Sequence, residues 1–126
     1  MERRVVDPVT QIEWIVPPFA TEEDTLARAR ADREGRLANL RLYPDHGAEY
    51  PLWAVDGPID DPGAIGVPEA LHGPLLRWQE LWASGCDVFE GWRSAEAEER
   101  WLALGRELHT ELEAALWLTT RVLACF

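Results

Sequence analysis

Lysine is absent from this chain, cysteine and methionine are scarce, and no long apolar run occurs. All 12 basic residues are arginines, a composition that is typical of a GC-rich genome and needs no functional explanation. The two cysteines, Cys86 and Cys125, lack the spacing of a metal site. We therefore expect two reduced thiols in a cytoplasmic protein.

Apolar runs in the chain are only a few residues long, whereas a membrane-spanning helix needs about 20 apolar residues. After the arginines near the N-terminus, Asp7 and Pro8 interrupt the apolar segment, so we expect no secretory signal. A chain of 126 residues with 47% apolar residues matches one globular domain.

Acidic residues outnumber basic ones by 23 to 12, and the excess is uneven. Residues 1–50 carry a net charge of −3, and residues 51–126 carry −8. Binding to nucleic acid or to an anionic membrane depends on basic residues that neutralise phosphate, so we expect neither as a partner. The same charge favours encounter with a basic protein.

Residues 9–16 have the pattern of a half-buried strand. Ile12, Trp14 and Val16 share one side at a period of two, and a Pro-Pro pair ends the segment.

A charged helix is predicted over residues 22–34. Thr21 is a suitable N-cap, three acidic residues follow it at the positive end of the helix dipole, and Gly35 is a typical stop. We treat residues 1–36 as an N-terminal extension, and whether it packs on the rest of the chain stays open.

Three further segments are expected to be extended. Residues 37–43 alternate partly, residues 49–55 form a short stretch, and residues 117–126 are apolar and β-branched, as in a strand well inside a sheet. Residues 56–67, which are rich in Gly and Pro, are predicted to be the longest loop.

The first core helix is expected over residues 68–84, with Pro74 either kinking it or splitting off a short first turn. Its apolar stripe has helical spacing and consists of Leu71, Leu75, Trp78 and Trp82, joined by Leu81.

The second core helix is expected over residues 95–116, with Ser94 as its N-cap. Gly105 lies beside its apolar stripe, where we expect a neighbouring element to approach closely. That stripe is the most regular in the chain and consists of Ala97, Trp101, Leu104, Leu108, Leu112 and Ala115.

Together these patterns predict an α+β fold of one domain overall. Residues 37–126 form its core, a three- or four-stranded sheet with a Trp-rich helix pair packed on one face. Residues 1–36 add the N-terminal strand and the charged helix.

Residues 40–124 resemble small proteins of GC-rich actinobacteria to which no activity is assigned. The resemblance rests on the Gly-Ala-Glu-Tyr-Pro-Leu-Trp turn from Gly47 to Trp53, on a helix bearing Trp78 and Trp82, and on the Gly91-Trp92 turn. It implies the same architecture and a bacterial cytosol, and it implies no catalytic residue.

Catalytic and metal-binding patterns are missing from the sequence. Ser84 and Ser94 lie at predicted helix ends, and no nucleophile-elbow motif occurs. The three histidines are far apart, and the acidic loop from Asp56 to Asp61 lacks EF-hand spacing. We therefore predict a non-enzymatic protein with no catalytic residues, no metal and no cofactor.

Trp53 and Trp92 lie in predicted turns rather than on helical stripes, and acidic residues flank both. Each indole is either a cap on the core or an exposed anchor for a basic partner, because aromatic residues are enriched at binding hot spots. The candidate binding residues are Glu49, Trp53, Asp56, Asp87, Glu90 and Trp92.

These observations lead to the hypothesis of an acidic protein-binding module. Its sharpest form is an immunity- or antitoxin-like neutraliser of a basic partner, such as a toxin or a nuclease. The alternative is a small-ligand binder or an undetected enzyme, with its site where the Gly47–Trp53 turn meets the Gly91-Trp92 turn. Both a monomer and a homodimer are compatible with the sequence.

Overall fold

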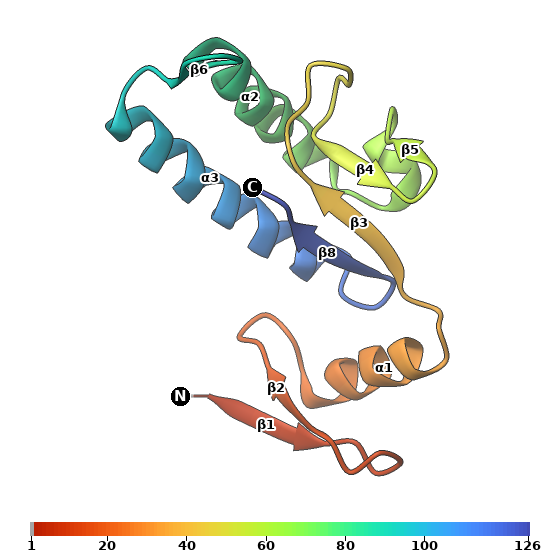
Figure 1. Ribbon diagram of the computed structural model, residues 1–126. Coiled ribbons are helices and arrows are strands. Elements are labelled where there is room, and N and C mark those ends of the chain that lie inside the picture. Colours follow the sequence, from red (N-terminus) through yellow and green to blue (C-terminus); the bar gives the residue numbers. More distant parts are fainter. Residues whose placement is uncertain (1) are drawn as a thin grey trace.

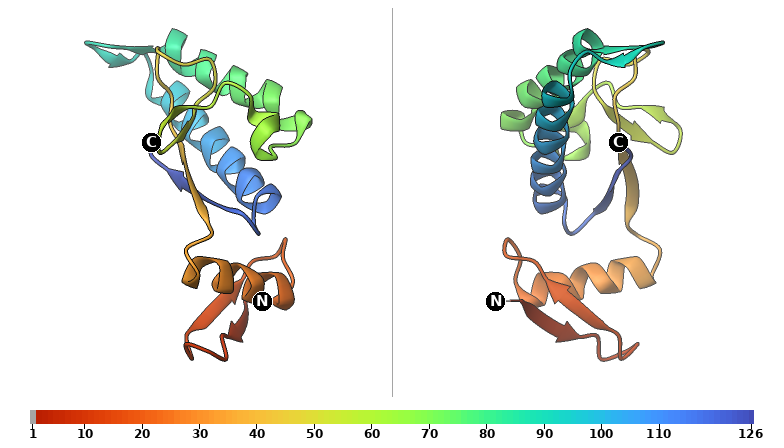
Figure 2. Two further views of the ribbon diagram at one scale, coloured as in Figure 1. Left: turned by 90° about the vertical axis from the view of Figure 1, so that its right-hand side faces the viewer. Right: turned by 60° about the vertical axis from the view of Figure 1, so that its left-hand side comes forward.

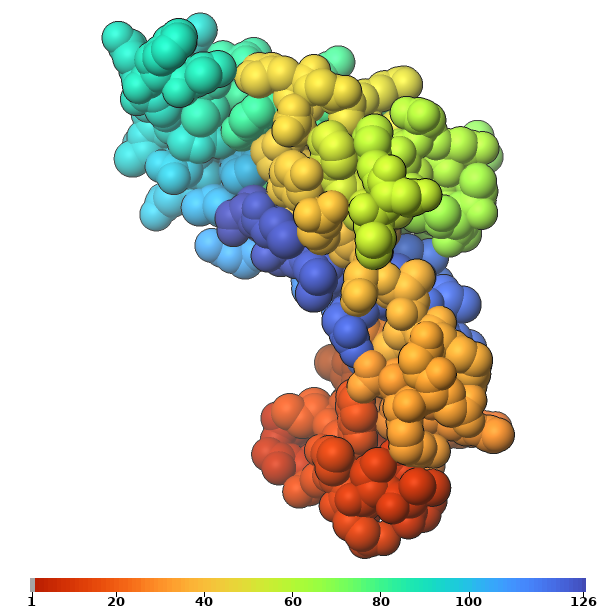
Figure 3. Space-filling model, turned by 45° about the vertical axis from the view of Figure 1, so that its right-hand side comes forward, coloured from red at the N-terminus to blue at the C-terminus, as the bar shows by residue number. Residues whose placement is uncertain are grey.

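The computed structural model describes residues 2–126, in which two parts of unequal size lie one beyond the other (Figure 1). We call residues 2–36 the N-terminal unit and residues 37–126 the core. The N-terminal unit forms a separate lobe in the space-filling view (Figure 3).

The N-terminal unit begins with a hairpin of β1 (Arg3–Val6) and β2 (Glu13–Val16), in which Val5 lies opposite Trp14. The expected strand over residues 9–16 was too long, and β1 was not predicted. The reason is a turn before β2, where the backbone N–H of Asp7 donates to Ile12 O at 2.9 Å and Gln11 has a φ of 62°.

Helix α1 (Glu22–Arg33) packs on this hairpin and confirms the predicted helix almost to its ends. The N–H of Asp24 donates to the Thr21 hydroxyl at 3.0 Å, which satisfies one free donor of the first turn. After the helix Gly35 adopts a φ of 70°, a conformation that glycine reaches without steric cost.

The core contains a four-stranded sheet in the order β5-β4-β3-β8, built from β3 (Ala38–Leu42), β4 (Leu52–Ala54), β5 (Gly57–Pro58) and β8 (Thr120–Ala124). The terminal segment does form a strand, but β8 pairs only with β3 and lies at the sheet edge. The expectation of a strand well inside the sheet was therefore wrong, since the apolar run covers one face only and Leu123 is 39% exposed.

The segment expected as a loop between residues 56 and 67 contains two short elements. Strand β5 pairs with β4, and the short 3-10 helix η1 (Pro62–Ile65) follows it. The Asp61 side chain caps η1 by accepting the N–H of Gly63.

Helices α2 (Glu69–Gly85) and α3 (Ala95–Ala115) form the predicted pair, and a small hairpin of β6 (Cys86–Asp87) and β7 (Gly91–Trp92) joins them. Helix α2 is not split at Pro74. The residue before this proline is Gly73, which has no Cβ to clash with the proline ring, and the lost hydrogen bond lies near the start of the helix.

The centre of the core is a stack of Trp78 from α2 on Trp101 from α3, with ring centroids 4.4 Å apart. Each indole N–H donates to the backbone carbonyl of the other tryptophan at 2.9 Å. A Cβ on Gly105 would lie 2.8 Å from the rings of Trp78 and Phe126, so the close approach expected at this glycine is confirmed. The predicted α+β fold, with a small sheet and a Trp-rich helix pair, is confirmed as well.

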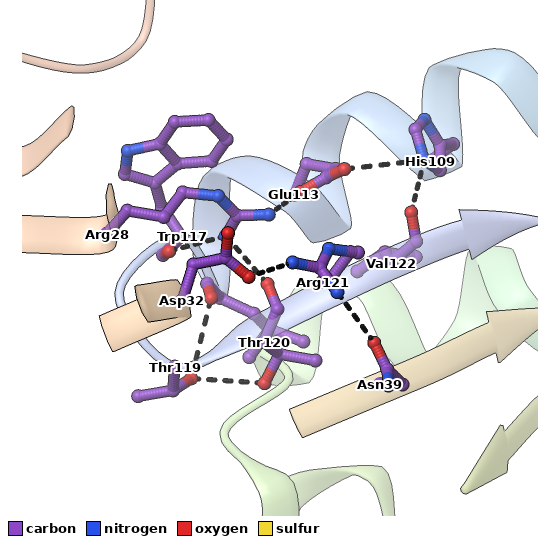
Figure 4. Close-up of polar contacts among 11 residues, drawn as sticks. Arg28, Asp32, Asn39, His109, Glu113, Trp117, Thr119, Thr120, Arg121 and Val122 are labelled. Carbon is purple, nitrogen blue, oxygen red and sulfur yellow. Dashed lines mark hydrogen bonds and ion pairs between the residues drawn. The ribbon is translucent and has the colours of Figure 1, made fainter. Parts of the chain in front are cut away.

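The N-terminal unit joins the core through the side chain of Arg28 (Figure 4). Its guanidinium donates to Trp117 O at 2.6 Å and Thr120 O at 2.8 Å, pairs with Glu113 at 3.3 Å, and lies 4.0 Å from the Trp117 ring centroid. Burial lowers the pKa of Arg28, and the Glu113 carboxylate opposes that shift. Asp32 of α1 also pairs with Arg121 of β8, and the Phe19 ring lies edge-on to the Trp117 ring with centroids 5.2 Å apart. Residues 2–36 thus pack on the core through one buried cation, one further ion pair and one aromatic contact.

None of the helices formed by residues 2–126 combines the length and apolar character needed to cross a membrane.

Candidate functional site

The most exposed aromatic side chain lies at the tip of the β6–β7 hairpin, which we call the acidic hairpin (Cys86–Trp92). Phe89 is 95% exposed and its neighbour Val88 is 73% exposed. Figure 2 shows the hairpin projecting beyond the end of α2. Two large apolar side chains are therefore held in solvent at a protruding point.

Asp87 fixes the shape of this tip. Its carboxylate oxygen Oδ1 accepts the backbone N–H groups of Phe89 at 2.8 Å and Glu90 at 2.9 Å. These bonds favour the charged form and lower the pKa of Asp87. Gly91 completes the turn with a φ of 79°, a left-handed conformation that suits glycine. The hairpin is consequently preorganised and keeps its negative charge.

The base of the hairpin is anchored in the aromatic core. The Trp92 ring lies 5.3 Å from Trp101, and a Cβ on Gly85 would come within 2.9 Å of the Trp92 ring. The backbone N–H of Arg93 donates to Gly85 O at 3.1 Å. Trp92 is thus half-buried and supports the hairpin, while Phe89 forms its apex.

An exposed aromatic apex between carboxylates suits a partner with an apolar pocket and a basic rim. Burying a phenylalanine side chain fully contributes about 1.5–3 kcal/mol. Rigid aromatic anchors dominate many protein interfaces because little rotamer freedom is lost on binding. Asp87 and Glu90 are both exposed and flank Phe89, whereas the sequence pattern placed them beside Trp92 as the anchor. The anchor itself was missed, although the Asp87 to Gly91 turn pattern places Val88 and Phe89 at the tip.

The other predicted aromatic, Trp53, lies in the sheet on β4. Its ring stacks on Tyr43 with centroids 5.0 Å apart, it is half-buried, and its buried indole N–H has no partner among the described residues. Glu49 and Asp56 are exposed in the turns that flank β4. This group forms a second aromatic and acidic area on the core.

The two predicted groups do not come together. Strand β4 lies beside the first half of α2, whereas β6 follows its last residue (Figure 1). The Gly47–Trp53 turn is held by Gln79, whose side-chain amide donates to the carbonyls of Asp45 at 3.1 Å and Glu49 at 3.2 Å. The five principal concavities formed by residues 2–126 are lined by other residues.

Ion pairs are distributed unevenly between the two parts of the chain. Among the described residues, Glu113 is the only one of the 13 carboxylates in residues 51–126 that lies within 4.0 Å of a basic group. In the N-terminal unit five carboxylates are paired with arginines, namely Glu2, Asp7, Glu13, Asp32 and Glu34. Most carboxylates of residues 51–126 therefore have no basic group beside them to offset their negative charge.

No group of three or more His, Cys, Asp or Glu side chains within residues 2–126 is arranged to hold a metal ion.

No protein-family model, curated protein or solved structure matches this chain.

Proposed function

We propose that this protein is a non-enzymatic, acidic docking module that binds a basic protein partner through the acidic hairpin. The observation that carries the proposal is Phe89, which is 95% exposed on a turn that Asp87 holds rigid. An apolar side chain fixed in solvent costs free energy that a binding partner recovers.

Charge supports the same proposal. Residues 51–126 have a net charge of −8, and nearly all their carboxylates lack an internal counterion. Such a surface speeds encounter with a basic partner over distances of about one Debye length, roughly 8–10 Å at physiological salt. Phosphate-bearing partners are repelled, so we propose a protein rather than a nucleic acid or a membrane surface.

In its sharpest form, the module neutralises a basic cytoplasmic toxin or nuclease. Enzymes that act on nucleic acid need basic side chains around their substrate groove. A protruding, acidic hairpin with an aromatic apex has the shape and charge to occupy such a groove. Neutralisation in this form requires no catalytic residue and no cofactor in the module.

The test compares capture of a partner from host-cell lysate by immobilised variants. Phe89→Ser removes the anchor, and Asp87→Asn removes a charge while keeping the oxygen that accepts two N–H groups. Val9→Ser is the matched control, since Val9 is 68% exposed in the N-terminal unit. Capture is measured at about 0.1 M and about 1 M salt, where the Debye length is roughly 10 Å and 3 Å.

We expect the wild type and Val9→Ser to retain one basic protein at the lower salt concentration. Phe89→Ser should reduce its retention at least about tenfold, since tenfold in affinity corresponds to about 1.4 kcal/mol. Asp87→Asn should weaken both capture and its salt dependence. Capture that is equally strong at 1 M salt, or equal losses from Phe89→Ser and Val9→Ser, would reject the proposal.

A further inference from the structure

A groove of about 230 Å³ runs between α2 and α3. Its floor includes the buried side chains of Trp78 and Leu108, and Leu81 and Leu104 form apolar walls that are 41% and 37% exposed. The helix pair that is packed on the inside of the core therefore leaves a second apolar contact surface open.

The apolar stripes of the two helices are wider than the interface they form. Leu81 continues the stripe of α2, and Leu104 occupies a regular position in the stripe of α3. Both were expected in the core, yet both border this groove. Each helix thus exposes one leucine of its apolar stripe in the groove between them.

The rim of the groove is charged asymmetrically. Glu107 and Glu111 line it from α3, one helical turn apart, and Arg77 lines it from α2. None of the three makes an ion pair among the described residues. An apolar floor beside two free carboxylates matches a helix whose apolar face is edged by basic residues.

The length of the groove fits two turns of such a helix. Seven residues separate its lining residues at each end, from Pro74 to Leu81 and from Leu104 to Glu111. Seven residues of helix span about 10.5 Å, the distance over which anchors at i, i+3, i+4 and i+7 recur. A second copy of the chain is less suitable, because the two rims together would hold four carboxylates and only two guanidinium groups.

We propose that the α2–α3 groove binds a basic amphipathic helix of the partner protein, with its apolar face on Leu81 and Leu104 and its arginines or lysines beside Glu107 and Glu111. This inference rests on the proposed function and assigns a second contact to the same partner. The acidic hairpin and the groove lie on the same helix pair and engage it together.

The probe is a synthetic peptide of about 15 residues, composed of Leu, Ala and Arg, with leucines at i, i+3, i+4 and i+7 and arginines along the edge. A peptide of the same composition in scrambled order is its control. Binding to the full-length protein is measured by fluorescence anisotropy. We expect the patterned peptide to bind at least tenfold more tightly than the scrambled one.

Two groove variants and one charge-matched variant make the test specific. Leu81→Ser/Leu104→Ser changes only side chains that are already exposed and should weaken peptide binding at least tenfold. Glu107→Gln/Glu111→Gln should weaken it severalfold and reduce its salt dependence. Glu22→Gln/Glu23→Gln removes the same charge from α1 and should leave binding within about twofold of the wild type. Circular dichroism checks that each variant is folded.

Equal binding of the two peptides, or equal loss from the two glutamine pairs, would overturn the inference. Light scattering that finds a dimer of the wild type and a monomer of Leu81→Ser/Leu104→Ser would also overturn it, since a second copy would then cover the groove. In each case the proposed function is judged separately, by whether partner capture depends on Phe89.

Discussion

The N-terminal unit and the core are stabilised by different means. The unit buries few large apolar side chains, with Val16 and three alanines as its buried apolar residues. It leaves several apolar side chains more than half exposed on its hairpin, namely Val6, Val9, Ile12 and Ile15. The core instead buries two stacked indoles whose N–H groups are both bonded. Aromatic packing thus organises the core, whereas residues 2–36 bury no comparable cluster of large side chains.

The two regions also use their acidic residues differently. Four carboxylates of the unit pair with its own arginines and Asp32 pairs with Arg121 of the core, whereas among the described residues Glu113 is the only carboxylate of the core with a basic group within 4.0 Å. Exposed ion pairs contribute little stability each. Their main effect in the unit is therefore to hold the paired side chains in position. The unpaired carboxylates of the core include Asp61 and Asp87, whose oxygens accept backbone N–H groups of their own turns. Under the proposed function, their charge faces a basic partner.

The largest effect is expected from Trp78→Ala. Truncating a buried tryptophan typically costs about 3–5 kcal/mol, and the Trp101 carbonyl would also lose its donor. Urea denaturation followed by circular dichroism should show the core unfolding at a much lower denaturant concentration. A loss below about 1 kcal/mol would mean that the indole stack does not hold the core together.

Arg28→Ala should have the next largest effect, and it should be confined to the N-terminal unit. It removes three polar contacts and leaves Glu113, whose side chain is 18% exposed, without its cation. Breaking such a pair costs about 3 kcal/mol. Hydrogen exchange should show faster exchange in α1 with little change in α3. The exposed Arg30→Ala, which breaks a pair with Glu34, is the control and should change exchange far less.

Gly105→Ala tests the close packing of the core by adding a methyl group, whereas Trp78→Ala removes a side chain. The added methyl would lie 2.8 Å from the rings of Trp78 and Phe126, so the rings must shift. Overpacking of this kind costs about 1–3 kcal/mol, more than the gain in helix propensity. Thermal unfolding should therefore occur at a lower temperature than in the wild type. An unchanged or raised Tm would show that Phe126 moves aside freely.

Acid should loosen the N-terminal unit through Asp7, with the smallest of these effects. The Asp7 carboxylate accepts the N–H of Val9 at 2.9 Å and pairs with Arg33, and the Val9 bond is the main reason that its pKa is lowered. Because the pKa of Asp7 is lower in the folded state than the unfolded value of about 3.9, the charged carboxylate stabilises the folded unit above that pH. This stabilisation is lost as the pH falls below about 3.9 and through the lower pKa of the folded state. The NMR signal of the Trp14 indole should report this loss below about pH 4.

Asp7→Asn provides the control for that titration. It should show weaker protection of the N-terminal unit at neutral pH and no further change through the same pH range. If the wild type and Asp7→Asn respond alike to acid, the titrating group lies elsewhere in the unit.

Helical periodicity predicted most of the core but not what covers each face. The stripes placed α2 and α3 well, because a period of 3.6 residues identifies the apolar side of a helix. Leu81 and Leu104 share those stripes and still lie 41% and 37% exposed. Sequence spacing shows which residues share one side of a helix. Whether each of them is buried depends on how much of that side the neighbouring element covers.

Short strands and turns were predicted less well. Strand β1 has only four residues, two of them arginines, so its pattern is too short to read. At the candidate site, Phe89 was not predicted, although its position at the tip follows from turn chemistry at Asp87 and Gly91. The lack of contact between the Gly47–Trp53 turn and the acidic hairpin tip depends on tertiary arrangement, which no local pattern contains.

The central claim is that the partner binds the acidic hairpin and the helix pair of the core rather than the N-terminal unit. Hydrogen exchange of the captured complex, compared with the free protein, tests it most directly. We predict slower exchange in residues 86–92 and along the α2–α3 groove, with residues 2–36 unchanged. Slower exchange centred on residues 2–36, with the acidic hairpin exchanging as in the free protein, would contradict the account.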